Sequence, residues 1–466
     1  MVTAIENRVN SLNEPFLNVP HNQENLLPVE KFSMDLLTKI QDRTAVVAVI
    51  GLGYVGLPLA ATCAEVGFTV NGIDLSEDKV AGLNRGESHI QDVPNEQLAS
   101  LVSNGRLRAH TDYDSVADAD IVIMCVPTPL NKTGDPDVSY ILAAGNALRD
   151  QLKPGALVVL ESTTFPGTTE ELLAPMLVEA GLTVGHDLFV AFSPERIDPG
   201  NPHFGLRNVP KVVGGMTPAC RTVAVAFYEA IVEKVVLVSS PIAAEMTKLL
   251  ENTFRSVNIA LVNEVAIMCS KLGVDVWEVI EAAASKPYGF MKFSPGPGVG
   301  GHCIPVDPNY LSWKLKHLNY NARFVQLAGE INAEMPAYVV GKVVDALNAQ
   351  RKAVNGSRVL VLGVAYKPDV DDVRESPALD ILRLLHARGA ELFYNDPYVA
   401  QLKLNGVTLE SQPLTSALLA AQDCVVIVTA HKDYDWANIT SAAKVIVDTR
   451  NVIRTGATER TTVIRL

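Results

Sequence analysis

The chain has 466 residues, of which 48% are apolar and 20% are charged. That length suits about three packed domains, and the composition excludes a disordered chain. The 52 acidic and 39 basic residues give a net charge of −13, which argues against a nucleic-acid groove because such a groove needs a basic face. The sequence has no stretch of about 18 apolar residues, the length that a membrane span needs.

The cysteines and histidines argue against two further classes. The six cysteines are scattered and form no C-x-x-C pair, unlike those of a disulfide-stapled secreted domain. Residues 1–43 have no basic segment followed by an apolar one, so we predict no signal peptide and a cytoplasmic location. The nine histidines show no H-x-H or H-E-x-x-H spacing, so we predict no metal centre.

In chain order, the first predicted element is an amphipathic helix from Pro28 to Gln41, inside a polar N-terminal extension. One face of this helix is apolar, with Phe32, Leu36, Leu37 and Ile40. We expect the extension to pack on its own domain, and a partner-binding arm is the alternative.

Short β-branched runs alternate with helical stretches from Thr44 to about Ser240, which is typical of βαβ units in a parallel sheet. The predicted strands cover residues 45–50, 69–73, 121–126, 156–160 and 189–192. The alternation returns from about Ser357, with predicted strands at residues 359–362, 391–394, 424–428 and 445–447.

The region between these two parts, from about Ile242 to Ala284, has a helical pattern without strands. Mostly apolar residues recur at spacings of three and four from Met246 to Met268, which predicts one long helix. Its apolar stripe has two interpretations, a dimer surface or internal core, and the sequence does not choose between them.

A glycine-rich turn follows the first predicted strand. Gly51 allows the tight turn, Gly53 lets the backbone approach a pyrophosphate, and Gly56 permits close helix packing, with Leu52, Tyr54 and Val55 between them. The helix beginning here offers N–H groups and a positive dipole to phosphates. About 20 residues on, Asp74 ends the next strand, where a carboxylate suits the ribose hydroxyls of NAD and repels the 2′-phosphate of NADP. We predict an NAD site, in which Lys79 is either a phosphate contact or a solvated helix residue.

The segment Ser294–Cys303 is the most unusual in the chain, because its ten residues include four glycines and two prolines. Such a segment forms a loop whose backbone can approach a ligand closely. Cys303 ends this loop, whereas the other cysteines lie in or beside helical or strand patterns and are expected to be buried packing residues. We therefore predict that Cys303 is a nucleophile. His302 is not favoured as its base, since adjacent side chains usually point apart.

A thiol has a specific use in a dehydrogenase. It adds to an aldehyde to form a thiohemiacetal, and loss of a second hydride then gives a thioester that water hydrolyses. Two rivals stay open: a two-electron alcohol dehydrogenase in which Cys303 is structural, and a non-catalytic NAD-binding module. The number of NADH formed per sugar separates the first rival, and any turnover excludes the second.

The sequence resembles the UDP-glucose/GDP-mannose dehydrogenase family from about Thr44 to Asn451. The resemblance rests on seven motifs in the family's order: V-I-G-L-G-Y-V-G-L-P at 49–58, C-V-P-T-P-L at 125–130, E-S-T-T-F-P-G-T-T at 161–169, S-P-E-R-I-D-P-G at 193–200, E-M-T-K-L-L-E-N-T at 245–253, G-P-G-V-G-G-H-C at 296–303 and Y-K-P-D-V-D-D-V-R-E-S at 366–376. It implies four-electron oxidation of a sugar C6 alcohol to a uronate, with NAD as acceptor.

The resemblance also implies roles for single residues. Cys303 matches the nucleophile, Lys248 and Asn252 match the donors to the developing oxyanion, and Asp307 and Thr164 match a pair associated with a water. Glu195 matches a glutamate with acid/base or water-positioning work. Thr128 and Arg374 match cofactor contacts. The expected contacts with the nucleotide sugar are Glu195, Arg196, Ile197, Lys248, Asn252, Pro295, Gly296, Gly300, Tyr366 and Lys367.

Departures from the glucose-type pattern bear on the sugar. After S-P-E the chain continues Arg196-Ile197-Asp198 instead of F-L-x-E, and Pro287 stands where glucose-type members carry an arginine supplied across the dimer, for which Lys286 is a candidate substitute. The segments P-E-R-I-D-P-G-N and K-P-Y-G-F-M look like those of UDP-N-acetylglucosamine 6-dehydrogenases that serve surface polysaccharide synthesis. We therefore favour UDP-N-acetyl-D-glucosamine, then UDP-N-acetylmannosamine, then UDP-glucose.

The expected fold class is α/β, with two Rossmann-like doubly wound domains joined by a central long-helix dimerisation region. The expected parts are an extension at 1–43, an NAD-binding domain at 44–240, a central region at 241–345 that includes the catalytic loop, and a UDP-sugar-binding domain at 346–466. A homodimer or higher homo-oligomer is expected, with no nucleic-acid or membrane partner.

Overall fold

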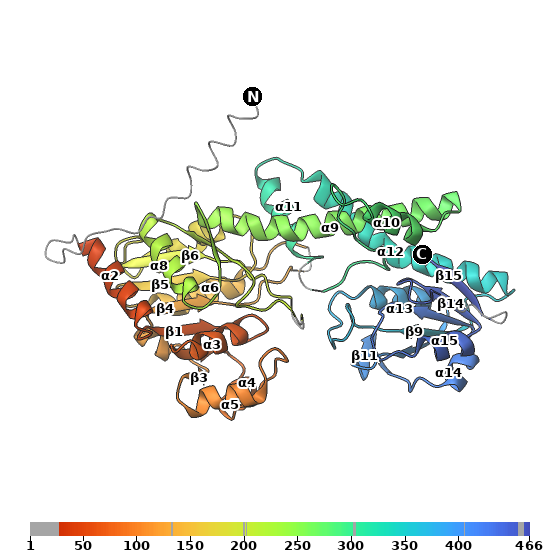
Figure 1. Cartoon of the computed structure of the whole chain (residues 1–466), viewed down its shortest axis with the longest axis horizontal. Helices are drawn as coiled ribbons and strands as arrows, with labels where there is room; N and C mark the ends of the chain where they lie inside the picture. Colours follow the sequence, from red (N-terminus) through yellow and green to blue (C-terminus); the bar gives the residue numbers. More distant parts are fainter. Residues whose placement is uncertain are drawn as a thin grey trace.

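The structure is a computed structural model that describes residues 28–131, 134–198, 201, 203–301, 304–404, 406–454 and 461–466, with only the backbone described for residues 28–30. The chain forms an N-terminal α/β part, a set of central helices and a C-terminal α/β part (Figure 1). Residues 1–27, which make up most of the predicted extension, lie outside the described residues.

The N-terminal part is built on one eight-stranded sheet with the order β3-β2-β1-β4-β5-β6-β7-β8. Every neighbouring pair is parallel except β6 and β7, which are antiparallel. The strands are β1 (Val46–Ile50), β2 (Thr69–Ile73), β3 (Leu107–His110), β4 (Ile121–Met124), β5 (Ala156–Leu160), β6 (Leu188–Phe192), β7 (Lys211–Gly215) and β8 (Val235–Val238).

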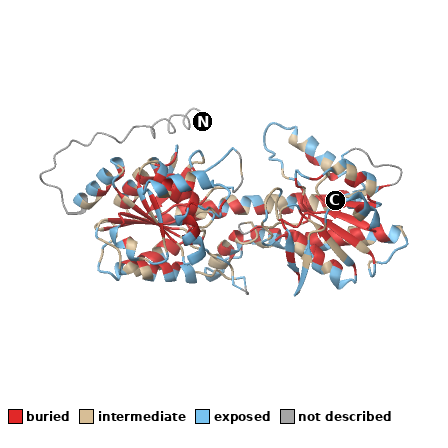
Figure 2. Ribbon diagram, turned by 90° about the horizontal axis from the view of Figure 1, so that it is seen from below, coloured by how far each residue is buried: buried red, intermediate tan, exposed pale blue. Residues whose placement is uncertain are grey.

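Helices cover both faces of this sheet, so its inner strands are apolar on both sides. In β1, Val47 and Val49 belong to one core cluster, and Ala48 and Ile50 belong to the cluster on the opposite face. Figure 2 shows the inner strands of both sheets as buried, under helices whose outer faces are exposed. The covering segments are α3 (Gly56–Glu65), α4 (Glu77–Asn84), α5 (Asn95–Ser103), η2 (Asp114–Asp118), α6 (Ser139–Arg149), η3 (Thr169–Leu173), α7 (Ala174–Val178) and α8 (Pro218–Glu229).

The predicted N-terminal helix is present as α2 (Pro28–Gln41). Its Leu36 and Ile40 are buried in the same core cluster as residues of α8, and Phe32 and Leu37 pack against that cluster. The expectation that this segment packs on its own domain is confirmed for residues 28–43.

The central helices are α9 (Pro241–Leu272), α10 (Val276–Ala284), α11 (Asp307–His317) and α12 (Arg323–Ala349). The predicted long helix is α9, but the helical pattern to Ala284 is divided, because Gly273 ends α9 in the left-handed conformation (φ 69°). In Figure 1, α9 runs from the N-terminal sheet to a position above the C-terminal part. Within the described residues, no helix is long and apolar enough to cross a membrane.

The C-terminal part has a parallel five-stranded sheet with the order β10-β9-β13-β14-β15 and a separate hairpin. The predicted border after residue 345 falls inside α12, whose Met335, Val339 and Val343 enter the C-terminal core. The elements are β9 (Arg358–Leu362), α13 (Pro377–Ala387), β10 (Glu391–Asn395), β11 (Gln401–Leu404), β12 (Val407–Glu410), α14 (Ser416–Ala421), β13 (Cys424–Ile427), α15 (Trp436–Ala442), β14 (Val445–Asp448) and β15 (Thr462–Arg465).

The expected fold class is confirmed, and all nine predicted strands are present within two residues of their predicted ends. Six further strands were not predicted: β3, β7, β8, β11, β12 and β15. Of these, β7 has the largest consequence for the site, because it places Lys211 beside Glu195.

Candidate active site

The glycine turn lies between β1 and α3, at the point of the sheet where the strand order reverses between β1 and β4. Gly51 has φ 87°, and a Cβ there would lie 2.4 Å from the Cys125 carbonyl oxygen. A Cβ on Gly56 would lie 1.8 Å from the Gly51 carbonyl oxygen. By contrast, a Cβ on Gly53 would meet no protein atom within 4 Å, so this position faces open space. Helix α3 begins with no side-chain cap and no acidic residue in its first turn. This turn therefore fits a pyrophosphate.

Asp74 follows β2 beside this turn, as predicted. Its Oδ2 accepts a hydrogen bond from Leu52 N at 3.1 Å, and its Oδ1 accepts one from Ser76 N at 3.0 Å. Lys79 Nζ lies 3.5 Å from Asp74 Oδ2. The carboxylate is thus oriented by the turn itself while part of it stays exposed, which suits a ligand hydroxyl.

The two other expected cofactor contacts join distant parts of the chain. The Arg374 guanidinium, from the C-terminal part, lies 5.8 Å from the centre of the Tyr54 ring. Its side chain also pairs with Asp372, which raises the pKa of Arg374. The carbonyl oxygen of Thr128 accepts a hydrogen bond from the Tyr310 hydroxyl of α11.

Lys248 and Asn252 lie one turn apart on the buried face of α9. The Asn252 side-chain amide donates a hydrogen bond to Oδ2 of Asp307, the first residue of α11. Burial raises the pKa of Asp307 to about 7, although Lys248 and Asn252 act in the opposite direction. The Asp307 carboxyl can therefore gain or lose a proton near neutral pH.

Thr164 is brought to the same place by its neighbour in the chain. Phe165 packs in one small cluster with Leu249, next to Lys248, and with Tyr310, one turn after Asp307. The Thr164 hydroxyl is buried and lies 2.7 Å from the Thr168 hydroxyl. The turn that follows is tied to α9, because the buried Glu245 carboxylate accepts hydrogen bonds from Gly167 N, Thr169 N and the Thr169 hydroxyl.

Glu195 lies just beyond β6 and is linked to α9 through its neighbour. Glu195 Oε1 accepts hydrogen bonds from Arg196 N at 2.6 Å and Ile197 N at 2.5 Å. The Arg196 guanidinium pairs with Glu251 at 2.6 Å, and Glu251 precedes Asn252. The structure thus gathers Glu195, Thr164, Lys248, Asn252 and Asp307 around the first half of α9.

The glycine loop at residues 294–301 is fixed between the central helices and the C-terminal part. The side-chain oxygen of Asn263, on α9, accepts a hydrogen bond from Gly296 N at 2.9 Å, and Pro295 and Gly296 are buried. At the other end, Gly301 N donates to the Arg374 carbonyl oxygen at 2.9 Å. A Cβ on Gly300 would lie 2.8 Å from the Cβ of Tyr366, so this glycine allows the loop to approach the C-terminal part.

Lys367 and Cys303 complete the predicted set. Lys367 Nζ pairs with Asp198 Oδ1 at 3.0 Å, so this ion pair joins the N-terminal and C-terminal parts. Cys303 and the neighbouring His302 lie outside the described residues. The other five cysteines are free thiols, and all but Cys125 are buried, as expected for packing residues. Burial raises the pKa of Cys424 to about 12, which makes that thiol a poor nucleophile.

Sequence reasoning missed two groups that meet the glycine loop. A Cβ on Gly296 would lie 2.7 Å from Nη1 of the half-buried Arg450, whose partial desolvation lowers its pKa to about 10. Nε of this guanidinium donates a hydrogen bond to the Val428 carbonyl oxygen at 2.7 Å, and Nη1 faces the loop. Behind the loop, Asn263 donates to the Asn332 side chain of α12 at 2.9 Å. The position of Arg450 just after β14, at the ligand-binding edge of a parallel sheet, was a signal available in the sequence.

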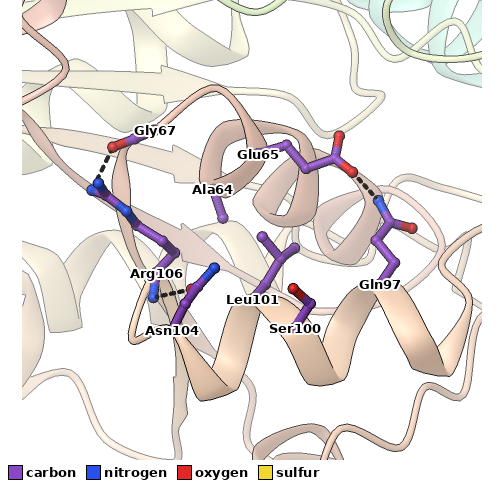
Figure 3. Close-up of a pocket in the computed structure, with 8 residues that line it drawn as sticks. All are labelled: Ala64, Glu65, Gly67, Gln97, Ser100, Leu101, Asn104 and Arg106. Atoms are coloured by element: carbon purple, nitrogen blue, oxygen red, sulfur yellow. Dashed lines mark hydrogen bonds between the residues drawn. The ribbon is translucent and has the colours of Figure 1, made fainter.

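A separate hollow of about 510 Å³ lies at the far end of α3, between α3 and α5 (Figure 3). Its polar groups are largely satisfied by one another or by backbone: Gln97 donates to Glu65 at 2.6 Å, and Arg106 donates to the Gly67 carbonyl oxygen at 2.6 Å. It lies at the C-terminal end of α3, away from the glycine turn, and brings together none of the predicted site residues.

A doubly wound sheet with a glycine turn at its switch point and an aspartate after the next strand defines a Rossmann-type dehydrogenase domain. Three family models match the chain in order: the NAD binding domain of the UDP-glucose/GDP-mannose dehydrogenase family at residues 45–232, its central domain at 242–334 and its UDP binding domain at 360–455. The chain belongs to the UDP-glucose/GDP-mannose dehydrogenase family and is an NAD-dependent UDP-sugar dehydrogenase, an oxidoreductase.

Similar proteins span nearly the whole chain. The UDP-N-acetyl-D-mannosamine dehydrogenase of Pyrococcus horikoshii is 34% identical over 88% of this chain and 96% of its own length, and that of Campylobacter jejuni is 38% identical over 83% and 96%. The solved structure of the Pyrococcus horikoshii enzyme covers 90% of this chain and 99% of its own, with a TM-score of 0.82. A UDP-glucose dehydrogenase structure from Pyrobaculum islandicum has 31% identity and a TM-score of 0.79, covering 90% of this chain and 97% of its own.

Proposed function

We propose that the chain oxidises the C6 alcohol of a UDP-N-acetylhexosamine to the uronate, with Cys303 as the nucleophile. The observation that supports this most is the grouping of Lys248, Asn252 and Asp307, which converge where α9 meets α11. Of these, Asp307 closely follows in the chain the loop that ends at Cys303. One NAD bound at the glycine turn would accept a hydride when the alcohol becomes the aldehyde, and a second NAD would accept another when the Cys303 adduct becomes the thioester.

The chain's own residues have separable tasks in this proposal. The Cys303 thiolate adds to the aldehyde carbon, and the Lys248 ammonium with the Asn252 amide stabilises the oxygen that becomes negative. After the thioester has formed, a water attacks it, and Glu195 or Asp307 accepts the proton that this water loses. Asp307 suits proton exchange because burial raises its pKa to about 7.

The sugar is the finer part of the proposal. The P-E-R-I-D-P-G-N and K-P-Y-G-F-M segments support UDP-N-acetyl-D-glucosamine, for synthesis of a surface polysaccharide precursor. UDP-N-acetyl-D-mannosamine is the second candidate, because relatives 34% and 38% identical have that name. The half-buried Arg450 guanidinium beside Gly296 and the Lys367 ammonium are the cations that we assign to the diphosphate of either substrate.

The test is the amount of NADH formed per sugar with UDP-N-acetyl-D-glucosamine, UDP-N-acetyl-D-mannosamine and UDP-glucose, compared by kcat/KM. We expect two NADH per sugar and the highest kcat/KM with UDP-N-acetyl-D-glucosamine. One NADH per sugar would support the two-electron rival, and a higher kcat/KM with the manno epimer would assign that substrate instead.

The role of Cys303 is tested by Cys303→Ala, which should abolish uronate formation and leave the Kd of NAD unchanged. The matched control is Cys424→Ala, which removes a buried thiol in the C-terminal sheet and should leave kcat unchanged. Near-normal turnover of Cys303→Ala would contradict the thioester route.

We also propose a homodimer formed through the apolar stripe of α9. Part of this stripe faces outward in the single chain: Leu250 is 63% exposed, Leu261 53% and Met268 47%, and the neighbouring Phe254 is 46% exposed, whereas Leu249 is buried. The buried face of α9 holds the polar residues Glu245, Lys248, Asn252 and Asn263 together with apolar residues such as Leu249, Val262 and Ala266. Large apolar side chains that stay exposed along one long helix favour the dimer interpretation of the stripe over the core interpretation.

Leu261→Glu tests this surface, because it places a charge at the centre of the stripe. The chain mass is 50.2 kDa, so we expect about twice that mass for the native protein in light scattering and the single mass for the variant. The control Val407→Glu alters an equally exposed apolar residue on β12 and should leave the mass unchanged. A native monomer would contradict the proposal.

A further inference from the structure

A cluster of ionisable side chains lies beneath Glu195 and has no assigned task. Lys211 Nζ lies 2.8 Å from Glu161 Oε2 and 3.4 Å from Glu195 Oε2. Both members of the shorter pair are almost fully buried, with 3% of the Lys211 side chain exposed and none of Glu161. The second Glu161 oxygen accepts a hydrogen bond from the Tyr228 hydroxyl.

The sheet topology explains how this cluster forms. Strands β6 and β7 are the antiparallel pair, with Ala191 opposite Gly215 and Phe192 opposite Gly214. If this register is extended past the end of β6, Glu195 lies opposite Lys211, the first residue of β7. Glu161 follows the neighbouring strand β5 and reaches the same edge of the sheet. A parallel β7 would have placed its first residue at the other edge.

We propose that Lys211 is a positioning residue whose ammonium, itself held by Glu161, fixes the orientation of the Glu195 side chain at the active-site edge of the sheet. The proposal rests on the proposed acid/base function of Glu195. Glu195 is then held at both oxygens, by two backbone N–H groups at Oε1 and by Lys211 at Oε2. A carboxylate held in this way is ready to accept a proton from the attacking water.

The charges around Glu195 support this assignment. The groups that face it or its partners are Lys211 from β7, Glu161 after β5, Tyr228 from α8, Cys63 from α3, Cys125 after β4, and Arg196 with its partner Glu251 from α9. Burial raises the pKa of Cys125 and of Tyr228 far above their usual values, so both stay neutral. Burial alone would lower the pKa of Lys211, but Glu161 and Glu195 outweigh it and raise the pKa, so Lys211 stays charged.

Two variants separate the effect of the cation from that of its second partner. Glu161→Gln keeps the shape and removes an anion that competes for Lys211, so Glu195 should remain ionised to lower pH. Adding Lys211→Met to Glu161→Gln removes the cation without leaving two buried carboxylates face to face. In this double variant the protonation of Glu195 should move to higher pH than in Glu161→Gln by about one pH unit or more.

The direct readout is the infrared band of the Glu195 carboxylate. It is identified as the band that each protein loses when Glu195→Gln is added, and its intensity is followed against pH in the absence of substrate. The second readout is the acidic limb of the kcat profile, which should move with the band. Lys211→Arg in the Glu161→Gln background should restore both, because it keeps the cation. The control Lys153→Met breaks a pair with Asp120 before β4, at the other edge of the sheet, and should move neither readout.

An infrared band that titrates at the same pH in Glu161→Gln and in the double variant, with both proteins folded by circular dichroism, overturns the proposal. If only the double variant unfolds, the deciding measurement is the band of Glu161→Gln compared with that of the wild type. A band that titrates at the same pH in these two proteins also overturns the proposal. If the infrared band shifts between the variants as expected but the wild-type protein turns over no UDP-sugar, the proposed function is rejected and the role of Lys211 is kept.

Discussion

The two α/β parts contain the same turn, used in opposite ways. Gly51 follows β1 and Gly363 follows β9, with φ values of 87° and 77°. A Cβ on either glycine would lie within about 2.4 Å of a backbone carbonyl oxygen in the loop after a neighbouring strand of the sheet. This oxygen belongs to Cys125 after β4 in one part and to Thr429 after β13 in the other. In both parts an aspartate after the neighbouring strand accepts a hydrogen bond from the turn, Asp74 from Leu52 N and Asp396 from Val364 N.

The difference lies in what remains free. Asp396 is fully buried and accepts further bonds from Ala365 N, Tyr398 N and Val399 N, with His431 Nε2 3.0 Å away. Asp74 accepts two backbone bonds and keeps part of its surface exposed. The third residue of the turn is Gly53 in the N-terminal part, where a Cβ would meet no protein atom within 4 Å. In the C-terminal part it is the buried Ala365. One turn is left open for a ligand, and the other is closed by its own carboxylate.

The largest expected effect comes from closing the open turn. Gly53→Val adds a side chain where no protein atom lies within 4 Å, so the fold should be kept while the pyrophosphate is excluded. We expect the Kd of NAD, measured by calorimetry, to rise by about a hundredfold, or ~2.8 kcal/mol. Ala365→Gly is the matched change in the C-terminal turn and should leave that Kd unchanged. A Gly53→Val protein with native affinity would show that the two turns are not used differently.

Asp396→Asn should reduce stability and leave NAD binding intact. Burial alone would raise the pKa of Asp396, but His431 and three backbone N–H groups lower it below its usual value of 3.8. A lowered carboxyl pKa contributes stability that is present above the unfolded value and is lost as pH falls through the folded one. We expect the variant to lose about 2 kcal/mol of unfolding free energy near pH 7, and less at pH 3, in urea titrations. An equal loss at both pH values would refute the electrostatic reading.

The smallest effect is expected at the aspartate of the open turn. Asp74→Asn keeps an oxygen that accepts from Leu52 N but removes the charge offered to the ribose hydroxyls, so the Kd of NAD should rise by about tenfold. The variant loses the bond from Ser76 N at this partly exposed site, so the unfolding free energy should fall by less than in Asp396→Asn. A large loss of stability with unchanged NAD affinity would reverse the assignments of the two aspartates.

The sequence identified what depends on local pattern. The glycine turn, Asp74 and the strands 69–73 and 156–160 were predicted because alternation and turn chemistry act over few residues. The short strands β3, β8 and β15 were missed, since four-residue runs in mixed sequence give little periodic signal. The break at Gly273 was also missed, because apolar spacing continues on both sides of it.

The contacts within the site depend on topology and were only partly accessible. Family resemblance assigned Lys248 and Asn252, which by pattern alone are polar residues on a helix. No pattern in one sequence pairs Lys211 with Glu161 or Asn263 with Asn332, since these partners are separated by 50 and 69 residues and meet only through strand order and helix packing. The outward direction of the α9 stripe likewise required the structure, because periodicity cannot tell an inner face from an outer one.

Helix α9 holds two parts of the site at once. Asn252 contacts Asp307 near its start, and Asn263 holds Gly296 further along its 32 residues. An α-helix advances about 1.5 Å and turns about 100° per residue, so these two side chains are about 16 Å apart along the axis. One residue inserted between them would swing the loop anchor about a quarter turn away from its loop. The number of residues in this stretch therefore sets both the spacing and the angular phase between the reacting groups and the loop.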